Sequence, residues 1–172
     1  TRQPKRPLLL LDAGANTDCD GAWLAQFAVM GSIYSRYALK RTEPVVGLLS
    51  IGTEDCKGNE MTKKAFSLIQ KTGVKFRGNV EGHDLFLGKT DVVVCDGFVG
   101  NVVLKTTESV AHAVGYWMKR EFFRHPVRMF GALLLKGALE TLKHRMDPEI
   151  YGGAPLLGVP GTVIITHGSS TY

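Results

Sequence analysis

Residues 91–105 have the sequence DVVVCDGFVGNVVLK, in which an apolar run ends at an Asp-Gly pair and a helical stretch begins. Short continuous apolar runs are typical of strands that are buried on both faces of a sheet. We therefore expect a strand over Asp91–Cys95 and a long helix over Val99–Phe123. Similar runs predict further strands of the same sheet over Leu8–Asp12, Val45–Ile51, Val74–Phe76 and Thr162–Thr166.

Stretches with helical periodicity lie between these strands. Apolar side chains recur at helical spacing over Asp20–Leu39 and over Asn59–Thr72, where Gly73 fits a C-cap. Pro126–Arg145 predicts another helix or a broken pair, with Gly131 as the expected break. The alternation of strands and helices predicts an α/β fold with a mostly parallel sheet flanked by helices.

Composition narrows the class of protein. The 172 residues are 44% hydrophobic and 22% charged, which favours one globular domain over a disordered chain. No apolar run approaches the about 20 residues of a membrane span, so we expect no integral membrane protein. Three cysteines without a CxxC pair argue against a disulfide framework or a zinc site and favour reduced thiols in the cytoplasm. The dinucleotide and nucleoside triphosphate motifs are absent, and we expect no metal or cofactor.

The positive charge is concentrated in one segment. Lys and Arg number 21 against 16 Asp and Glu, a net charge of +5. The window 119–145 alone holds seven basic and two acidic residues, which accounts for the whole excess. Such a patch fits an acidic partner or surface. The expected docking residues are Lys119, Arg120, Arg124 and Arg128.

An apolar tip lies inside this basic segment. Seven uncharged residues separate Arg128 from Lys136, and their apolar character extends almost all round the helix. Basic flanks around an apolar tip favour contact with anionic lipid or with a partner subunit, and a helical hairpin in a dimer interface fits equally well. Nucleic-acid binding is not expected, because basic and aromatic residues do not interleave. The expected membrane contacts are Phe130, Leu133, Leu134 and Leu135.

The loops after the strands are the candidate ligand sites, because open α/β sheets bind ligands beyond the carboxyl ends of their strands. Gly97 and Gly100 would let the backbone approach a ligand, and N–H groups at the following helix start would face an anion. Lys105 lies one turn further along. The alternative to anion binding is a tight turn from strand to helix, with Asp96 or Asn101 as the helix cap.

Three other loops carry candidate contacts. Asn16 lies in the loop after the first strand, and Lys57 and Asn59 precede a helix, where Lys57 could neutralise a phosphate. The alternative is a solvated lysine beside an Asn cap. The segment His167-Gly168-Ser169-Ser170 follows the last expected strand. Because the GxSxG elbow of hydrolases is absent, Ser169 and Ser170 fit phosphate or substrate contacts better than nucleophilic catalysis.

Five segments of the chain are distinctive: residues 11–19, 46–52 with 57–60, 78–82, 91–105 and 151–159. Together they resemble one family, the bacterial phosphate acyltransferases of phospholipid synthesis (PlsX family). The resemblance covers nearly the whole chain and corresponds to the C-terminal half of such an enzyme. The N-terminal half is expected to be absent from residues 1–172, and a basic, apolar helical segment is expected to protrude at 119–145.

The resemblance implies the reaction of an acyl-[acyl carrier protein] with inorganic phosphate to give acyl phosphate and free carrier protein. It implies a Rossmann-like three-layer sandwich similar to phosphotransacetylases and isocitrate dehydrogenases. Relatives of that group line their cleft with a segment that Gly100, Asn101 and Lys105 fit, and with a Ser- and Gly-rich loop that Ser169 and Ser170 fit loosely. An arginine of that loop is replaced here, with His167 as the candidate substitute.

The implied partners are acyl carrier protein, inorganic phosphate, a second copy in a homodimer, the membrane surface and glycerol-3-phosphate acyltransferase. The implied location is cytoplasmic with peripheral membrane association. One alternative is a phosphotransacetylase or phosphotransbutyrylase that uses acyl-coenzyme A. Another is an inactive fragment that binds carrier protein or lipid.

Overall fold

The computed structural model describes residues 7–146 and 153–166. The chain divides into two compact units, residues 1–104 and residues 105–172, and helix α3 (Gly97–Phe123) continues from the first into the second.

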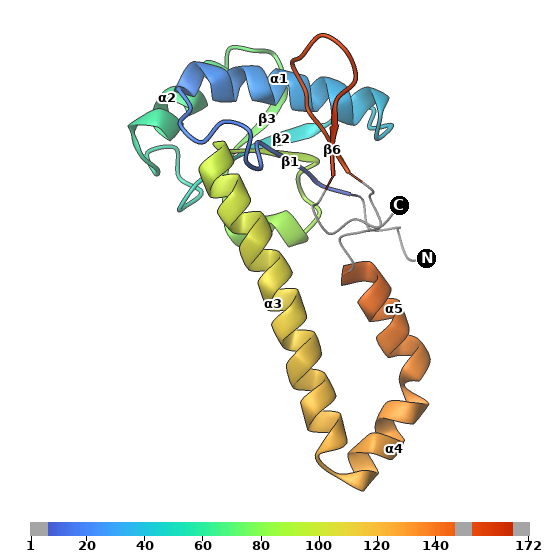
Figure 1. The fold of residues 1–172 in the computed structure, drawn as a ribbon. Coiled ribbons are helices and arrows are strands. Elements are labelled where there is room, and N and C mark those ends of the chain that lie inside the picture. Colours follow the sequence, from blue (N-terminus) through green and yellow to red (C-terminus); the bar gives the residue numbers. More distant parts are fainter. Residues whose placement is uncertain (1–6, 147–152, 167–172) are drawn as a thin grey trace. The chain divides into compact units, whose positions relative to one another are not determined.

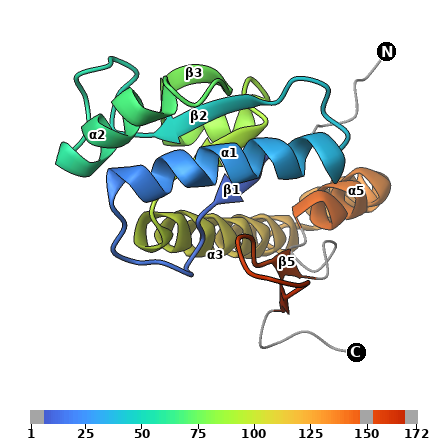
Figure 2. The ribbon, with the colours of Figure 1, turned by 90° about the horizontal axis from the view of Figure 1, so that it is seen from above.

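The first unit is built around a four-stranded parallel sheet (Figures 1 and 2). Its spatial order is β1-β4-β2-β3, so the last of these four strands along the chain lies between the first and the second. Helices α1 (Gly21–Tyr37) and α2 (Glu60–Ile69) pack side by side on one face. The predicted α/β fold with a parallel sheet flanked by helices is therefore confirmed. The strands are β1 (Leu9–Leu11), β2 (Val45–Leu49), β3 (Lys75–Val80) and β4 (Val92–Val94).

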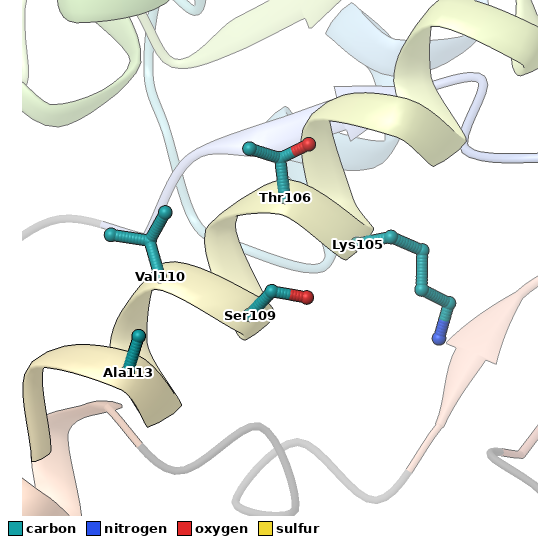
Figure 3. Close-up of a pocket in the computed structure, with 5 residues that line it drawn as sticks. All are labelled: Lys105, Thr106, Ser109, Val110 and Ala113. Atoms are coloured by element: carbon teal, nitrogen blue, oxygen red, sulfur yellow. The ribbon is translucent and has the colours of Figure 1, made fainter. Parts of the chain in front are cut away.

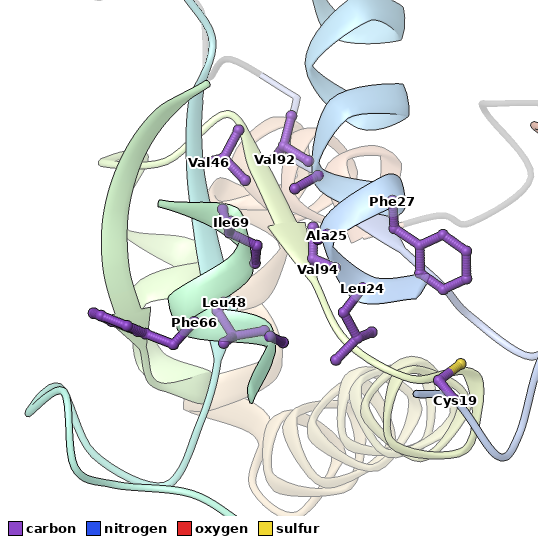
Figure 4. Close-up of a cluster of buried hydrophobic side chains, with 12 residues drawn as sticks. Cys19, Leu24, Ala25, Phe27, Val46, Leu48, Phe66, Ile69, Val92 and Val94 are labelled. Carbon is purple, nitrogen blue, oxygen red and sulfur yellow. The ribbon is translucent and has the colours of Figure 1, made fainter. Parts of the chain in front are cut away.

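The core fills the space between the two helices and the sheet (Figure 4). Gly31 lets α1 lie close to the sheet, since a Cβ there would come within 2.7 Å of Val92 Cγ1. Phe66 and Phe76 form an edge-to-face pair with ring centroids 5.1 Å apart. The fully buried side chains of this core include Leu24, Ala28, Val46, Leu48, Ile69, Val92 and Val94.

Strand β3 (Lys75–Val80) is longer than the strand expected over Val74–Phe76. The pairing with β2 joins Val46 to Phe76 and Gly47 to Gly78, so Arg77 is an extra residue. Gly78 has a φ of +102°, which glycine adopts without strain. After this irregularity the pairing with β2 resumes and continues through Val80.

The second unit contains the rest of α3, helices α4 (Pro126–Leu134) and α5 (Lys136–Met146), and two short strands. The broken helical pair is confirmed, but the break lies at Leu135 rather than at Gly131. The Gly131 carbonyl still accepts a 3.1 Å bond from the Leu135 N–H, so helical bonding continues through the glycine. Leu135 itself has φ −92° and ψ 4°, outside the helical range. None of the described helices combines the length and the apolarity needed to cross a membrane.

The prediction that Thr162–Thr166 forms a fifth strand of the parallel sheet is wrong. Strand β6 (Ile164–Ile165) pairs antiparallel with β5 (Ala154–Pro155) in a separate two-stranded sheet. Its residues are exposed rather than buried. A short apolar run does not by itself distinguish a buried strand from an exposed hairpin strand.

Candidate functional site

The loops after β1 and β4 meet at the carboxyl edge of the sheet, because these two strands are neighbours. The Gly97 N–H donates a 2.7 Å hydrogen bond to the Asn16 carbonyl, and the Asp12 N–H donates a 3.1 Å bond to the Cys95 carbonyl. The Cys95 thiol lies 3.3 Å from the Asp12 carbonyl oxygen. The two loops therefore form one continuous surface.

Two glycines make this close approach possible. A Cβ at Gly100 would lie 1.8 Å from the Asp12 carbonyl oxygen, and one at Gly97 would lie 2.7 Å from the Asn16 carbonyl oxygen. Asn101 also belongs to this surface, since a Cβ at Gly14 would lie 3.8 Å from both Cβ and Cγ of Asn101. Gly97 and Gly100 were expected to let the backbone approach a ligand. In the structure they instead let the start of α3 approach the backbone of the loop after β1.

Asp12 organises the first loop. Its carboxylate accepts 2.8 Å hydrogen bonds from the backbone N–H groups of Gly14, Ala15 and Asn16 and from the Asn16 side chain. Burial raises the pKa of the Asp12 carboxyl, but these hydrogen bonds outweigh it and leave the pKa below its ordinary value. We did not single out Asp12 from the sequence, although an Asp followed by Gly and Asn is a turn signal.

Asp96 caps α3, which is the arrangement expected as the alternative to anion binding. The Val99 N–H donates a 2.9 Å hydrogen bond to Asp96 Oδ1, and the carboxylate is buried. Burial raises the pKa of the Cys95 thiol to about 12, and the nearby charges of Asp96 and Asp12 add to the effect. The helix start therefore already holds a negative group, and an anionic ligand is better placed toward the exposed Asn101.

Lys105 lies one turn after Asn101 in α3 and within the second unit. Its Nζ lies 3.2 Å from Glu108 Oε2 in a half-exposed ion pair. Figure 3 shows Lys105 and Ser109 projecting to the same side of the helix. Together with Thr106, Val110 and Ala113 they line a shallow depression on this helix.

The remaining expected ligand contacts lie in the loop after β2 and at the end of the chain. Asn59 caps α2, because its side chain accepts a 2.9 Å bond from the Thr62 N–H. Lys57 is exposed, with Nζ 4.0 Å from Glu54 Oε1. His167, Ser169 and Ser170 lie outside the described residues.

Glu121 lies among the basic residues at the end of α3. It pairs with both Arg124 and Arg128. Lys119 and Arg120 are exposed, and neither has an ion pair among residues 7–146 and 153–166. Arg120 and Arg124 also border a shallow depression that Trp117 and Phe123 line.

Helix α4 exposes the apolar side chains expected at the tip. They are Phe130 (63% exposed), Leu133 (66%), Leu134 (72%) and, just after the helix, Leu135 (53%).

Across the described part of the chain, no group of three or more His, Cys, Asp or Glu side chains is arranged to hold a metal ion. The three cysteines are free, and only Cys56 is exposed.

The chain is an α/β protein with a parallel sheet, and its Asp-, Gly- and Asn-rich loops lie at the carboxyl edge. In open α/β sheets this edge is the usual position of a ligand site. A family model described as fatty acid synthesis protein matches residues 1–172, and the chain belongs to this family. This confirms the resemblance found in the sequence.

Proteins named phosphate acyltransferase are similar to this chain. That of Aliarcobacter butzleri is 54% identical over 162 residues, which cover 94% of this chain and 48% of the relative. Those of Acidobacterium capsulatum and Helicobacter hepaticus are each 52% identical, over 95% and 96% of this chain and 49% of each relative. The chain thus spans about half the length of the curated relatives it matches.

Proposed function

We propose that this chain contributes to a phosphate acyltransferase that converts acyl-[acyl carrier protein] and inorganic phosphate into acyl phosphate and free carrier protein. The observation that carries the proposal is the family match over residues 1–172, joined by relatives of that name at 52–54% identity. The product would serve phospholipid synthesis. The α/β fold and the joined loops at its carboxyl edge support a ligand site of this kind.

The reaction needs little acid–base chemistry from the protein. A phosphate oxygen attacks the thioester carbon, the C–O bond forms, the C–S bond breaks, and the leaving thiolate takes a proton. Thiolates leave readily because the thiol pKa is about 8.5. The protein must hold phosphate against the thioester and stabilise the oxyanion.

We assign the phosphate contacts to Asn101 and Lys105. Residues four apart on a helix lie on the same face, and both side chains are exposed. Gly97 and Gly100 hold the β1 loop against the helix start, with Asp96 as the cap. Asn16, Lys57, Asn59, His167, Ser169 and Ser170 remain proposed substrate contacts.

We propose the basic segment as the docking surface for acyl carrier protein, which is strongly acidic. Lys119, Arg120, Arg124 and Arg128 are exposed, and opposite charges across an interface steer association. The apolar tip of α4 is the proposed peripheral membrane contact, which would bring acyl phosphate to a glycerol-3-phosphate acyltransferase. A homodimer remains part of the proposal.

Replacement of Lys105 tests the phosphate assignment. The assay is acyl phosphate formation by a full-length protein of this family that contains the 172-residue sequence. Lys105→Ala should raise the KM for phosphate by about tenfold or more, because hydrogen bonds to charged groups contribute about 1.5–3 kcal/mol. The matched control is Lys63→Ala, since Lys63 forms a similar i,i+3 ion pair with Glu60 on α2. Unchanged phosphate dependence in Lys105→Ala would refute the assignment.

A further inference from the structure

One face of helix α3 carries a seam of side chains at alternating spacings of four and three residues, the repeat at which two helices pack together. Figure 3 shows three of these side chains, Thr106, Val110 and Ala113, projecting to the same side of the helix. At about 1.5 Å per residue the seam is about 27 Å long. Its members are Thr106, Val110, Ala113, Trp117, Arg120 and Arg124.

Two shallow depressions lie along this seam. The first surrounds Ser109 and Ala113, and the second lies between Trp117 and Arg124. Residues of α3 and of its C-terminal end line both depressions, and no other described element covers them. The larger apolar side chains beside them are open to solvent, with Val110 55% and Trp117 60% exposed. Such an alternation of hollows and ridges is the relief into which a second helix packs.

The half-buried apolar side chains of α3 lie on a different side of the helix. Ala111, Met118 and Phe122 are less exposed than Val110 and Trp117, and the turn of about 100° per residue places them away from the seam. Helices α4 and α5 of the same unit pack against each other. An exposed tryptophan on an uncovered face is typical of an interface with another protein.

The charges of this face favour an acidic occupant. Residues 105–124 hold four basic and two acidic side chains, a net charge of +2. Both acids already face a basic partner, Glu108 at Lys105 and Glu121 at Arg124. A second copy of the chain would bring two positive faces together, which disfavours association, whereas the charge of an acidic partner is complementary.

We propose that this face of α3 binds an amphipathic helix of an acidic partner protein. The apolar ridge of that helix packs over Val110 and Trp117, and its acidic side chains pair with Arg120 and Arg124. The inference rests on the proposed function, which names acyl carrier protein as the acidic partner, and it adds an apolar anchor and a helical seam to a docking surface otherwise made of charges. A carrier protein held here would lie beside Lys105, the proposed phosphate contact.

A synthetic helical peptide tests the face directly. It has one apolar ridge of leucines at i, i+3, i+4 and i+7 and glutamate at most other positions, the pattern by which helices are recognised in grooves. Isothermal titration of the 172-residue chain with this peptide should show saturable binding. A peptide of the same composition in scrambled order lacks the ridge and should bind at least about tenfold more weakly. Absent binding of the first peptide, or equal binding of the scrambled one, overturns the inference.

Trp117→Ala removes the apolar anchor. It should weaken binding of the peptide by about tenfold or more, because buried aromatic anchors dominate the binding energy of interfaces. The loss should be the same at low and high salt, since salt screens charges and not apolar contacts. The matched control is Tyr116→Ala, which removes a neighbouring aromatic side chain that is 63% exposed and lines neither depression. Equal losses from both variants, or no loss from Trp117→Ala, overturn the inference.

Arg120→Gln tests the charged part of the same face. It should weaken binding of the peptide by about threefold at low salt and leave it unchanged at high salt. A loss that does not depend on salt would show that acidic groups are not recognised, which overturns the inference. Self-association of the chain that Trp117→Ala abolishes, measured by ultracentrifugation, would assign the face to a second copy and overturns it as well.

Acyl carrier protein separates this inference from the proposed function. It should compete with the peptide and lose affinity with Trp117→Ala but not with Tyr116→Ala. If the carrier protein binds the parent and Trp117→Ala equally well, the inference fails and the proposed function stands. If the peptide binds through Trp117 while the carrier protein does not bind, the α3 face is supported and the carrier protein fails as the proposed partner.

Discussion

The backbone N–H of Gly97 donates a 2.7 Å hydrogen bond to the carbonyl oxygen of Asn16. This bond joins the start of α3 to the loop after β1, two segments that are distant in the sequence and adjacent in the sheet. Both loops contain proposed substrate contacts. Their separation would therefore change the site before it changed the core between α1, α2 and the sheet.

Gly100→Ala should separate these loops. The new Cβ would lie 1.8 Å from the Asp12 carbonyl oxygen, a backbone atom that cannot move without displacing the loop. We expect the free energy of unfolding to fall by about 1–3 kcal/mol or more, as for other overpacked sites. Urea unfolding followed by circular dichroism measures the change.

Gly115→Ala is the matched control in the same helix. A Cβ at Gly115 meets no atom within 4 Å, so the substitution should stabilise the helix by up to about 1 kcal/mol. Equal destabilisation by both variants would show that the contact with Asp12 is not the cause.

Asp12 should make stability depend on pH in the acidic range. Its folded-state pKa lies below the ordinary value, so the ionised carboxylate stabilises the fold at neutral pH. This contribution is complete above the unfolded-state pKa of about 3.9 and is lost as the pH falls through the folded-state pKa. Asp12→Asn cannot ionise. The difference in unfolding free energy between the two proteins should shrink as the pH falls from about 5 through the folded-state pKa, and a constant difference would contradict this role.

The elements that local chemistry determines were predicted well. Strands β1, β2 and β4 fall inside the expected ranges, because each apolar run ends at Asp, Gly or Ser. The capping of α3 by Asp96 and of α2 by Asn59 was foreseen as one of two alternatives. In both loops the same residue types suit a cap and a ligand contact, so composition alone could not decide between them.

Features that depend on distant partners were not predictable. Whether Ile164 and Ile165 join the parallel sheet depends on which strand they pair with, which their apolarity does not reveal. The hydrogen bond from Asn79 Nδ2 to the carbonyl of Glu54 depends on the register between β2 and β3. Gly131 has the low helix propensity of a break, but its helical hydrogen bond forms nonetheless.

Glu121→Gln should strengthen binding to an acidic partner. Glu121 pairs with Arg124 and Arg128, and its neutralisation raises the local positive charge and releases both guanidinium groups. We expect acyl carrier protein to bind about threefold more tightly at low salt, with the gain lost at high salt. Stability should change by less than about 1 kcal/mol, because exposed ion pairs contribute little.

Isothermal titration at two salt concentrations measures this effect. Glu60→Gln is the control, since it removes an exposed acid that pairs with Lys63 on α2. Equal gains from both substitutions would assign the effect to net charge rather than to this surface.

The apolar tip of α4 should determine vesicle binding. Leu133, Leu134 and Leu135 are each more than half exposed, and burial of a leucine side chain in lipid contributes about 1.5–3 kcal/mol. Replacement of all three by Glu should weaken binding to vesicles by about 100-fold or more in co-sedimentation. The loss should also occur on zwitterionic lipid, where the basic flanks contribute little. Ile33→Glu, an exposed apolar position on α1, should leave binding unchanged. If the triple variant still binds zwitterionic vesicles as tightly as the parent, the tip is not the membrane contact, and its exposed leucines would then fit a protein interface.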